Sequence, residues 1–538
     1  MNKKIKTISN LVLTLIIAAV FVACSSDKDG ENNKQVSGKD SKFGGTIVVA
    51  KNMTPPHLDS DKSTDWVISS IMNHVYESLF EFDENYEPQP YLAESYEVTE
   101  SGKVYDIKIR KGVLFHNGKE MTSEDVEASF KRWMKNNQGG NMIAPYFDKL
   151  EVTGPYELKF IFKRAYAPFI SILGSYVSNQ KLVIRPKELI EKYGDNIMRE
   201  HIGTGPYKFI KWIPDQEVRL ERFENYVSSD KPASGYTGKR AAYADKIIIK
   251  SISEQATRIA GVQTGEFQFV EEIPQDQYEI VKRDSNMEPE IVKPDAGLMV
   301  IMNCGTPPFD NKKIRRALAY AIDMEEYGRT VIGDENFWTV DGCMYPKGTV
   351  WYEENSGSGV YNNYDPKKAK ELLKEVGYDG TPIVILSGQE DKVEKYGSIA
   401  LKEQLEKAGF NVKLELFDKP TVIDRRSKKE GWNLHLSGFY MACPDPQVEG
   451  AWTGTNAWIS NWDDDDSHAM DKIFERMMLE TDKKKRFEIV KEFYNKTWES
   501  LPYIKTFEYS RMHVRNRNLN GYKIYCQPFF WNTWIEKK

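Results

Sequence analysis

The sequence predicts a multidomain α/β protein, and three observations support this fold class. Strand-like and helical segments alternate at Pro382–Ser387 (strand), Val393–Ala408 (helix), Val412–Phe417 (strand) and Trp432–Phe439 (strand). The run Leu298–Asn303 is apolar up to its last residue, as in a strand buried on both faces, and apolar residues recur at helical spacing from Ile314 to Ile322. Of the 538 residues, 40% are apolar, enough for several cores. A prior of ~150 residues per domain suggests about three or four domains.

A compact unit of strands and one helix is predicted between Tyr91 and Trp133. Residues 104–110 alternate between polar and apolar, which is the period of a half-buried strand. Thr122 stands three residues before Asp125, a spacing typical of the first turn of a helix. Strands therefore precede a capped helix in this unit.

The segments around this unit are predicted in the same way. Gly45–Lys51 is expected to be the first strand, Trp66–Phe80 has the apolar spacing of a helix, and Leu150–Phe162 is expected to form a hairpin. The glycines of Ile202–Tyr207 could suggest a phosphate-binding loop. However, Pro206 lacks a backbone donor and no Lys-Ser/Thr pair follows, so a turn that enters a strand is predicted instead.

The N-terminus predicts export and a lipid anchor. Three lysines within the first six residues precede the apolar run Leu11–Ala23, which is too short to span a bilayer but suits a signal peptide. Ala23 followed by Cys24 resembles a bacterial lipoprotein cleavage site. We expect residues 1–23 to be removed, Cys24 to be diacylated and residues 24–42 to form a flexible tether. The alternative is an ordinary signal peptide that happens to contain a cysteine.

Charge and cysteine usage narrow the function classes. Removal of residues 1–23 changes the formal net charge from −6 to −9, so nucleic-acid binding has no electrostatic support. The remaining cysteines are widely spaced, at Cys304, Cys343, Cys443 and Cys526. Their spacing assigns no disulfide, and free, buried cysteines are an equal alternative.

Catalytic and metal-binding patterns are absent from the sequence. It contains no HExxH, HxH or GxSxG motif and no Cys/His signature. Asp463–Asp466 with His468 could suggest a metal site, but an acidic loop that caps the following helix is the preferred interpretation. We therefore predict no catalytic residues, no cofactor and no metal.

Two long motifs carry a family resemblance. Residues 92–132 contain LAESYEV, KIRKGVLFHNGK and MTSEDVEASFKR in that order, and residues 307–323 read PPFDNKKIRRALAYAID. Together they resemble the extracellular solute-binding proteins of the peptide/nickel type, which include the oligopeptide- and dipeptide-binding receptors of ABC importers. The resemblance covers nearly the whole chain after residue 42.

The resemblance implies a two-lobed α/β fold of the periplasmic-binding-protein type, with an extra domain inserted in lobe one. Lobe one would contain residues 43–66, 187–297 and 504–538, and the inserted domain would contain residues 67–186. Lobe two would be continuous, from 298 to 503. Closure of the lobes would enclose a ligand.

The resemblance also places the ligand. Phe439, Tyr440 and Met441 would end a strand of lobe two at the cleft. An acid that binds the peptide ammonium in relatives falls here on Ala442, so Asp445 or Glu508 would have to replace it, or the ligand lacks a free amine. For Asp445, a structural role in an Asp-Pro turn is the preferred alternative.

Further contacts are implied at Met53, Asn303 and Phe507, and Trp452, Trp458 and Trp462 make the neighbourhood aromatic. Aromatic side chains suit both peptide side chains and sugar faces.

The predicted function is a lipid-anchored substrate-binding protein of an ABC importer, which captures peptides and delivers them to the permease. It would act as a monomer on the outer face of the cytoplasmic membrane, or on the periplasmic side in a two-membrane host. The alternatives are the same fold with an oligosaccharide or another organic solute that lacks a free α-amine, and an extracellular hydrolase.

Overall fold

The computed structural model describes residues 42–536, except residues 64, 177–179, 441–444, 452, 456 and 458–459. The side chains of residues 294, 295, 440, 449 and 451 also lie outside that description. A search of the described helices finds none with the length and apolar character needed to cross a membrane.

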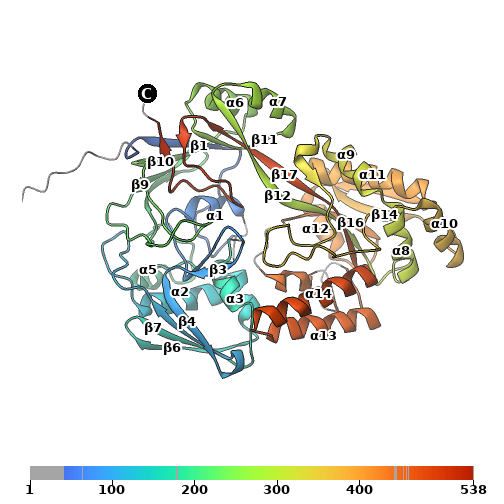
Figure 1. Cartoon of the computed structure of the whole chain (residues 1–538), viewed down its shortest axis with the longest axis horizontal. Helices are drawn as coiled ribbons and strands as arrows, with labels where there is room; N and C mark the ends of the chain where they lie inside the picture. The colour runs from blue at the N-terminus through green and yellow to red at the C-terminus, as the bar shows by residue number, and fades with distance from the viewer. Residues whose placement is uncertain are drawn as a thin grey trace, which may run out of the picture. The chain divides into compact units, whose positions relative to one another are not determined.

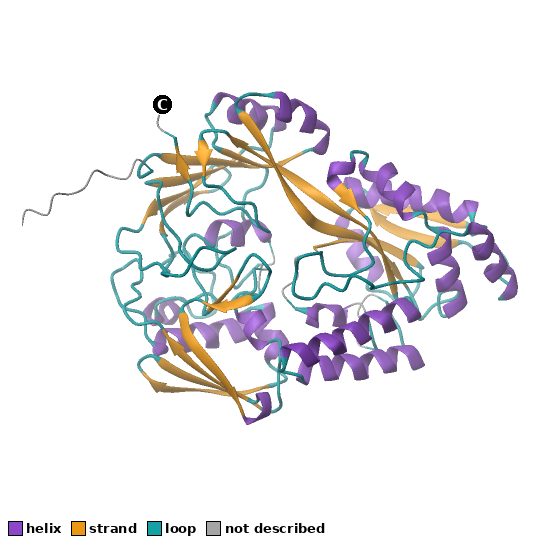
Figure 2. Ribbon diagram, in the orientation of Figure 1, coloured by secondary structure: helices purple, strands orange, loops and turns teal. Residues whose placement is uncertain are grey.

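One large mixed sheet forms the centre of the fold (Figures 1 and 2). Its strands are β1 (Thr46–Lys51), β8 (Tyr207–Ile213), β9 (Glu217–Arg222), β10 (Lys246–Ser251), β11 (Phe269–Ile273), β12 (Met287–Met302), β13 (Trp338–Thr339), β14 (Ile383–Gly388), β15 (Val412–Phe417), β16 (Leu434–Tyr440) and β17 (Tyr503–Asn516). Their order is β15-β14-β16-β12-β17-β11-β1-β10-β9-β8, and β13 pairs with β17. β1 lies parallel to β10 and β11, and β14 lies parallel to β15 and β16. Parallel and antiparallel pairs in one sheet confirm the α/β class.

Two long neighbouring strands, β12 and β17, run through the middle of this sheet (Figure 1). β12 pairs with β16 through Ala296–Met302, and β17 pairs with β11 near its own C-terminal end. The ladder between β12 and β17 is irregular between Val292 and Ala296. The same two strands thus connect both ends of the sheet, with a local break in their pairing.

Separate hydrophobic cores lie along the sheet. The largest one contains buried residues from Leu298 to Phe507. The helices of this part are α8 (Lys312–Ala321), α9 (Met324–Ile332), α10 (Pro366–Glu375), α11 (Lys392–Lys407), α12 (Lys419–Arg426), α13 (Asp465–Leu479) and α14 (Lys483–Ser500). A second core joins β1, β8, β9 and β10 to α1 (Trp66–Met72), and a third joins β11 and the end of β17 to α6 (Gln255–Thr264) and α7 (Tyr278–Arg283).

A smaller antiparallel sheet has a core of its own (Figure 2). Its strands are β4 (Ala93–Thr99), β5 (Val104–Ile109), β6 (Phe147–Gly154) and β7 (Glu157–Phe162), in the order β4-β5-β7-β6. The main helix is α2 (Ser123–Asn136), and the carboxylate of Asp125 accepts a hydrogen bond from the backbone N–H of Thr122 at 3.0 Å. The predicted hairpin and capped helix are confirmed.

The remaining elements are short. They are β2 (Phe80–Phe82), β3 (Pro88–Pro90), β18 (Leu519–Asn520), β19 (Trp534–Ile535), α3 (Gln138–Ile143), α4 (Phe169–Leu173), α5 (Lys187–Tyr193) and the 3-10 turns η1 (Glu100–Gly102), η2 (Gln275–Gln277), η3 (Glu335–Phe337) and η4 (Pro446–Ala451).

The segment that follows β7 contacts α13 and η4. The hydroxyl of Tyr166 donates to Oε1 of Gln447 at 2.6 Å, and the backbone N–H of Ala167 donates to the carbonyl of Met478 at 2.8 Å. These bonds join the domain of the small sheet to the part of the chain that holds the largest core.

The predicted helix Trp66–Phe80 is wrong in its second half, because α1 ends at Met72. The carbonyls of His74 and Val75 accept hydrogen bonds from the backbone N–H groups of Tyr207 and Gly205, at 3.1 and 3.0 Å. These bonds come from the predicted turn 202–207, which does enter strand β8. A Cβ atom on Gly205 would lie only 2.5 Å from the carbonyl oxygen of His74, so the close approach needs glycine.

Candidate functional site

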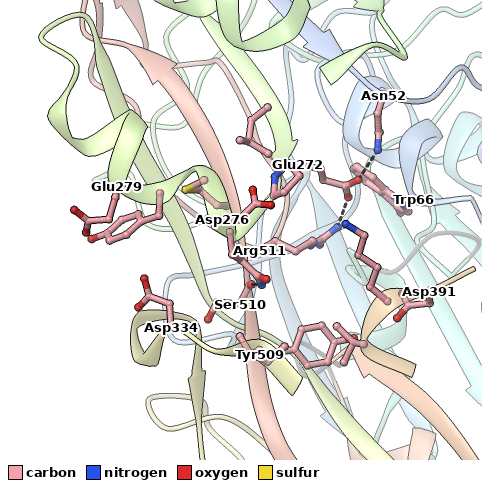
Figure 3. Close-up of a pocket in the computed structure, with 18 residues that line it drawn as sticks. Asn52, Trp66, Glu272, Asp276, Glu279, Asp334, Asp391, Tyr509, Ser510 and Arg511 are labelled. Carbon is pink, nitrogen blue, oxygen red and sulfur yellow. Dashed lines mark hydrogen bonds and ion pairs between the residues drawn. The ribbon is translucent and has the colours of Figure 1, made fainter. Parts of the chain in front are cut away.

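A cavity of about 740 Å³ lies over β17 (Figure 3). Residues 509–512 of β17 form part of its lining. One side comes from the end of β11, η2 and α7, with Asn52 and Trp66 beside them. The other side comes from Ile332 at the end of α9, from Asp334 beyond it, and from the start of α11. Segments from both sides of the central strand β17 therefore meet in one cavity.

A bulge in β11 directs Glu272 into this cavity. The pairing of β11 with β17 shifts register between Val270 and Ile273, and Glu272 has a φ of 53°. Such a positive φ is strained for a residue with a side chain, and bulges commonly redirect side chains near functional sites. The local backbone is thus shaped to place this carboxylate.

Glu272 is held by two partners, as Figure 3 shows. Its Oε1 accepts from Nη1 of Arg511 at 2.9 Å, and its Oε2 accepts from Nδ2 of Asn52 at 3.0 Å. Arg511 belongs to β17 and Asn52 follows β1, so the three side chains join three strands. The arrangement is fixed before a ligand enters, which reduces the entropy lost on binding.

Trp66 lies between two cations. The Nζ atom of Lys51 is 5.0 Å from the indole centroid, and the guanidinium of Arg511 is 5.3 Å from it. Lys51 is itself buried and forms an ion pair with Glu271. Burial raises the pKa of Glu271, and the neighbouring Lys51 partly offsets that effect. These cation–π contacts hold the indole of Trp66 beside Arg511 and the buried Lys51–Glu271 ion pair.

Two aspartates on the opposite side of the cavity begin helical turns. Asp391 accepts from the backbone N–H of Glu394 at 2.9 Å at the start of α11. Asp334 accepts from the backbone N–H of Asn336 at 2.9 Å at the start of η3. Their carboxylates are positioned by these caps and line the cavity.

The residues predicted to contact a ligand have varied surroundings. Met53 follows β1 and is 38% exposed. Asn303 is fully buried, and its amide donates to the carbonyls of Lys429 and Trp432. These surroundings show that Asn303 also holds a loop.

Two of the predicted aromatic contacts belong to the largest core. Phe439 is buried at the end of β16. Phe507 is fully buried, and its ring lies 5.4 Å from that of Tyr327. Neither is part of the cavity lining, so their contact with a ligand stays a prediction.

The two acids suggested as substitutes at Ala442 have partners within the protein. Asp445 is buried and paired with Arg486 through two hydrogen bonds. Glu508 pairs with Lys505 at 2.7 Å, and both are buried. An Asp-Pro turn role is evident for Asp445, because its Oδ1 also accepts from the backbone N–H of Gln447 at 3.0 Å.

Several predictions fall outside the described residues. These are the lipidation at Cys24, the contacts at Met441 and Ala442, the side chain of Tyr440, and Trp452 and Trp458. Trp462 is described and is buried. Cys304, Cys343 and Cys526 are buried thiols, whereas Cys443 is not described. Within the described part of the chain, no group of three or more metal-ligating side chains is placed to hold an ion.

Sequence reasoning missed the residues that line the cavity, including Trp66, Glu272, Asp334 and Arg511. The lining comes from six separate segments of the chain, so no local motif unites these residues. The only local signal was the pair Glu271-Glu272 at the end of an apolar strand, where one of two successive acids must turn toward the opposite face.

Known proteins share this fold and sequence pattern. A periplasmic-binding protein of Sinorhizobium fredii, y4tO, named as a probable peptide ABC transporter component, is 26% identical over 85% of this chain and 87% of its own length. The oligopeptide-binding protein AppA of Bacillus subtilis is 25% identical over 99% of this chain and 100% of its own. The crystal structure of the ABC transporter substrate-binding protein CtaP of Listeria monocytogenes superposes with a TM-score of 0.79 at 22% identity, covering 92% of this chain and 100% of CtaP.

The family assignment rests on a model match over most of the chain. The model of the bacterial extracellular solute-binding proteins, family 5, matches residues 87–461. This range includes both motifs recognised in the sequence and all four strands of the small sheet. Members of this family are receptors for solutes and not enzymes. The chain belongs to the bacterial extracellular solute-binding proteins of family 5.

Proposed function

We propose that this protein is the lipid-anchored receptor of an ABC importer, and that it captures peptides and delivers them to the permease. The family assignment and the peptide-specific names of the two curated relatives support the proposal. The observation that carries it is the cavity of about 740 Å³ over β17, lined by segments from both sides of this central strand. Its size is typical of sites that enclose an organic ligand.

The proposal includes a two-lobed mechanism. Lobe one would comprise residues 43–66, 187–297 and 504–538, with residues 67–186 as its inserted domain, and lobe two would comprise residues 298–503. The proposed boundaries fall within β12 and at the start of β17, close to the irregular part of their ladder. Bending there would move one lobe against the other, and closure would exclude water from the bound peptide. The closed form would then engage the permease.

The predicted ligand contacts remain part of this proposal; they are Met53, Asn303, Phe439, Tyr440, Met441, Ala442, Asp445 and Phe507. The cavity adjoins these predicted contacts in the chain, because its lining residue Asn52 directly precedes Met53. A peptide held across the lobes would meet both groups of residues.

The test is native mass spectrometry of residues 25–538, which include every described residue, after expression in rich medium. Denaturation should release peptides. A released sugar, or another organic solute without an amine, would overturn peptide capture and favour the alternative.

A pair of variants ties the released ligand to the cavity. Gln275 lines it, so Gln275→Trp should fill it and reduce the amount of ligand released. Gln263→Trp places the same side chain on the exposed face of α6, outside the lining, and should leave the yield unchanged. Equal yields from the two variants would assign the ligand to another place.

A further inference from the structure

The cavity over β17 has an unbalanced charge. Carboxylates outnumber cations in its lining. The carboxylates are those of Glu272, Asp276, Glu279, Asp334 and Asp391, and the cations are Lys392 and Arg511. A cavity with this lining favours a ligand with positive charge.

Two of these carboxylates are already matched within the protein. Glu272 pairs with Arg511 at 2.9 Å, and Glu279 pairs with Arg283 at 3.2 Å. In contrast, Asp276, Asp334 and Asp391 have no ion-pair partner among the described residues. Lys392 is the one lining cation without such a partner among the described residues, so the three aspartates leave a net excess of two negative charges.

The three aspartates belong to both proposed lobes. Asp276 lies in η2, beside the end of β11, whereas Asp334 and Asp391 belong to the part of the chain with the largest core (Figure 3). Closure of an empty cavity would hold like charges together as water is removed, which is unfavourable. A cation between the two sides would remove this penalty.

The aromatic lining suits the same ligand. Tyr509 lines the cavity from β17, and Tyr278 lines it from lobe one, where Nζ of Lys282 already lies 5.2 Å from the Tyr278 ring centroid. The face of an aromatic ring carries partial negative charge and attracts ammonium and guanidinium groups, so the ring of Tyr509 suits a cationic ligand. Carboxylates and aromatic rings in one cavity are the combination that proteins use to bind such cations.

We propose that this cavity receives a cationic group of the captured peptide, either its α-ammonium or a lysine or arginine side chain, and that the receptor therefore selects positively charged peptides. The inference rests on the proposed peptide capture and specifies its substrate class. The cavity would also bind the positive charge of the peptide, a role that the uncharged side chain of Ala442 cannot perform.

Calorimetric titration of residues 25–538 with three alanine pentapeptides tests this selectivity. Their central residue is lysine, glutamine or glutamate. The lysine peptide should bind about tenfold more tightly than the glutamine peptide, and the glutamate peptide should bind most weakly. N-acetylated forms of the same peptides separate the contribution of the α-ammonium from that of the lysine side chain.

Two substitutions remove charge while keeping the helix caps. Asp334→Asn and Asp391→Asn retain a capping oxygen, so the fold should persist. Each should reduce the preference for lysine over glutamine by about threefold. Matched controls are Glu335→Gln, next to Asp334 but outside the lining, and Glu403→Gln, exposed on α11; both should leave the preference unchanged.

The outcomes separate this inference from the proposed function. Equal affinities for the three peptides, or a lysine preference that survives both aspartate substitutions together, would overturn charge selection and leave peptide capture standing. Failure of alanine peptides of every length and charge to bind would overturn peptide capture itself, and the inference with it.

Discussion

The carboxylate of Asp445 accepts two hydrogen bonds from the guanidinium of Arg486, at 2.7 and 2.6 Å, and both side chains are buried. The pair joins the turn before η4 to helix α14. The neighbouring Asp445 carboxylate raises the pKa of Arg486 despite the opposing effect of its burial. The acid nearest to Ala442 therefore already has its counter-charge inside the protein.

Asp445→Ala should strongly destabilise the protein. Removal of one partner leaves a buried, unpaired guanidinium, which typically costs about 3–5 kcal/mol. Urea unfolding followed by circular dichroism would measure the loss. Glu475→Ala, which removes the exposed partner of Arg164, is the matched control and should cost less than about 1 kcal/mol. Similar losses for the two variants would show that Asp445 is not a structural residue.

Tyr166→Phe should weaken ligand binding without weakening the fold. The hydroxyl of Tyr166 bonds to Gln447 across the contact between the small-sheet domain and η4. If that contact forms on closure, its loss destabilises only the closed form, by about 1 kcal/mol, and lowers peptide affinity roughly fivefold. Titration calorimetry measures the affinity.

Tyr193→Phe removes a hydroxyl that bonds to the exposed Glu200 within the proposed lobe one, and it provides the control for this experiment. It should not change peptide affinity. In a double-mutant cycle, Gln447→Leu should add little to Tyr166→Phe, because both substitutions break the same hydrogen bond. Fully additive effects would disprove the link between this bond and closure.

His116 should make the stability depend on pH. Its Nε2 donates to the carbonyl of Gly205 at 2.9 Å, while Nδ1 accepts from the backbone N–H of Gly203 at 3.2 Å, so the ring must be neutral. Burial lowers the pKa of His116 to about 4. The unfolded chain protonates this histidine near pH 6.5, so its contribution is complete above that pH and falls as the pH drops to about 4.

The loss for this single residue should reach about 3 kcal/mol at the lower end of that window. Urea unfolding at a series of pH values would measure it, with His116→Gln for comparison. The variant should be less stable at neutral pH but should show a flatter pH dependence. An identical slope for His116→Gln and the native protein would exclude His116 as the source.

The sequence predicted those elements whose signals are local. The hairpin of β6 and β7, the cap at Thr122 and the strand after Pro206 all follow from residues within a few positions of each other. The end of α1 could not be predicted from nearby residues. The chain leaves the helix where the carbonyls of His74 and Val75 accept hydrogen bonds from Tyr207 and Gly205, which are far along the chain. Helical periodicity continues through Val75 although the helix stops at Met72.

The cavity was beyond sequence reasoning for a related reason. Glu272 reaches it through a bulge and a positive φ, and neither has a signature in the residue types. Asp334 and Asp391 look like ordinary capping residues in the sequence, and they are capping residues. Their second role arises only because β17 brings the two segments near Arg511. The family resemblance predicted the architecture, whereas the charge of the cavity can be recognised only from the three-dimensional structure.

Cys24→Ala should release the protein from the membrane. The predicted lipoprotein site places the lipid on this thiol, and two acyl chains are enough for stable anchoring. Membrane fractionation together with metabolic labelling by an alkyne fatty acid would show the loss of both the label and the membrane association. Cys526→Ala removes a buried thiol and should keep both. A Cys24→Ala protein that remains labelled would disprove the anchor.

Trp66 should report ligand binding through its fluorescence. The indole lines the cavity and lies between Lys51 and Arg511, so a ligand that enters changes both its exposure to water and the local field. Peptide titration should therefore shift the emission of the native protein, and Trp66→Phe should abolish most of the shift. Trp534→Phe removes an indole that stacks on Lys42 outside the cavity, and it should leave the response intact. A shift that persists in Trp66→Phe at the same peptide affinity would mean that the peptide is bound away from this cavity, because no other tryptophan among the described residues lines it.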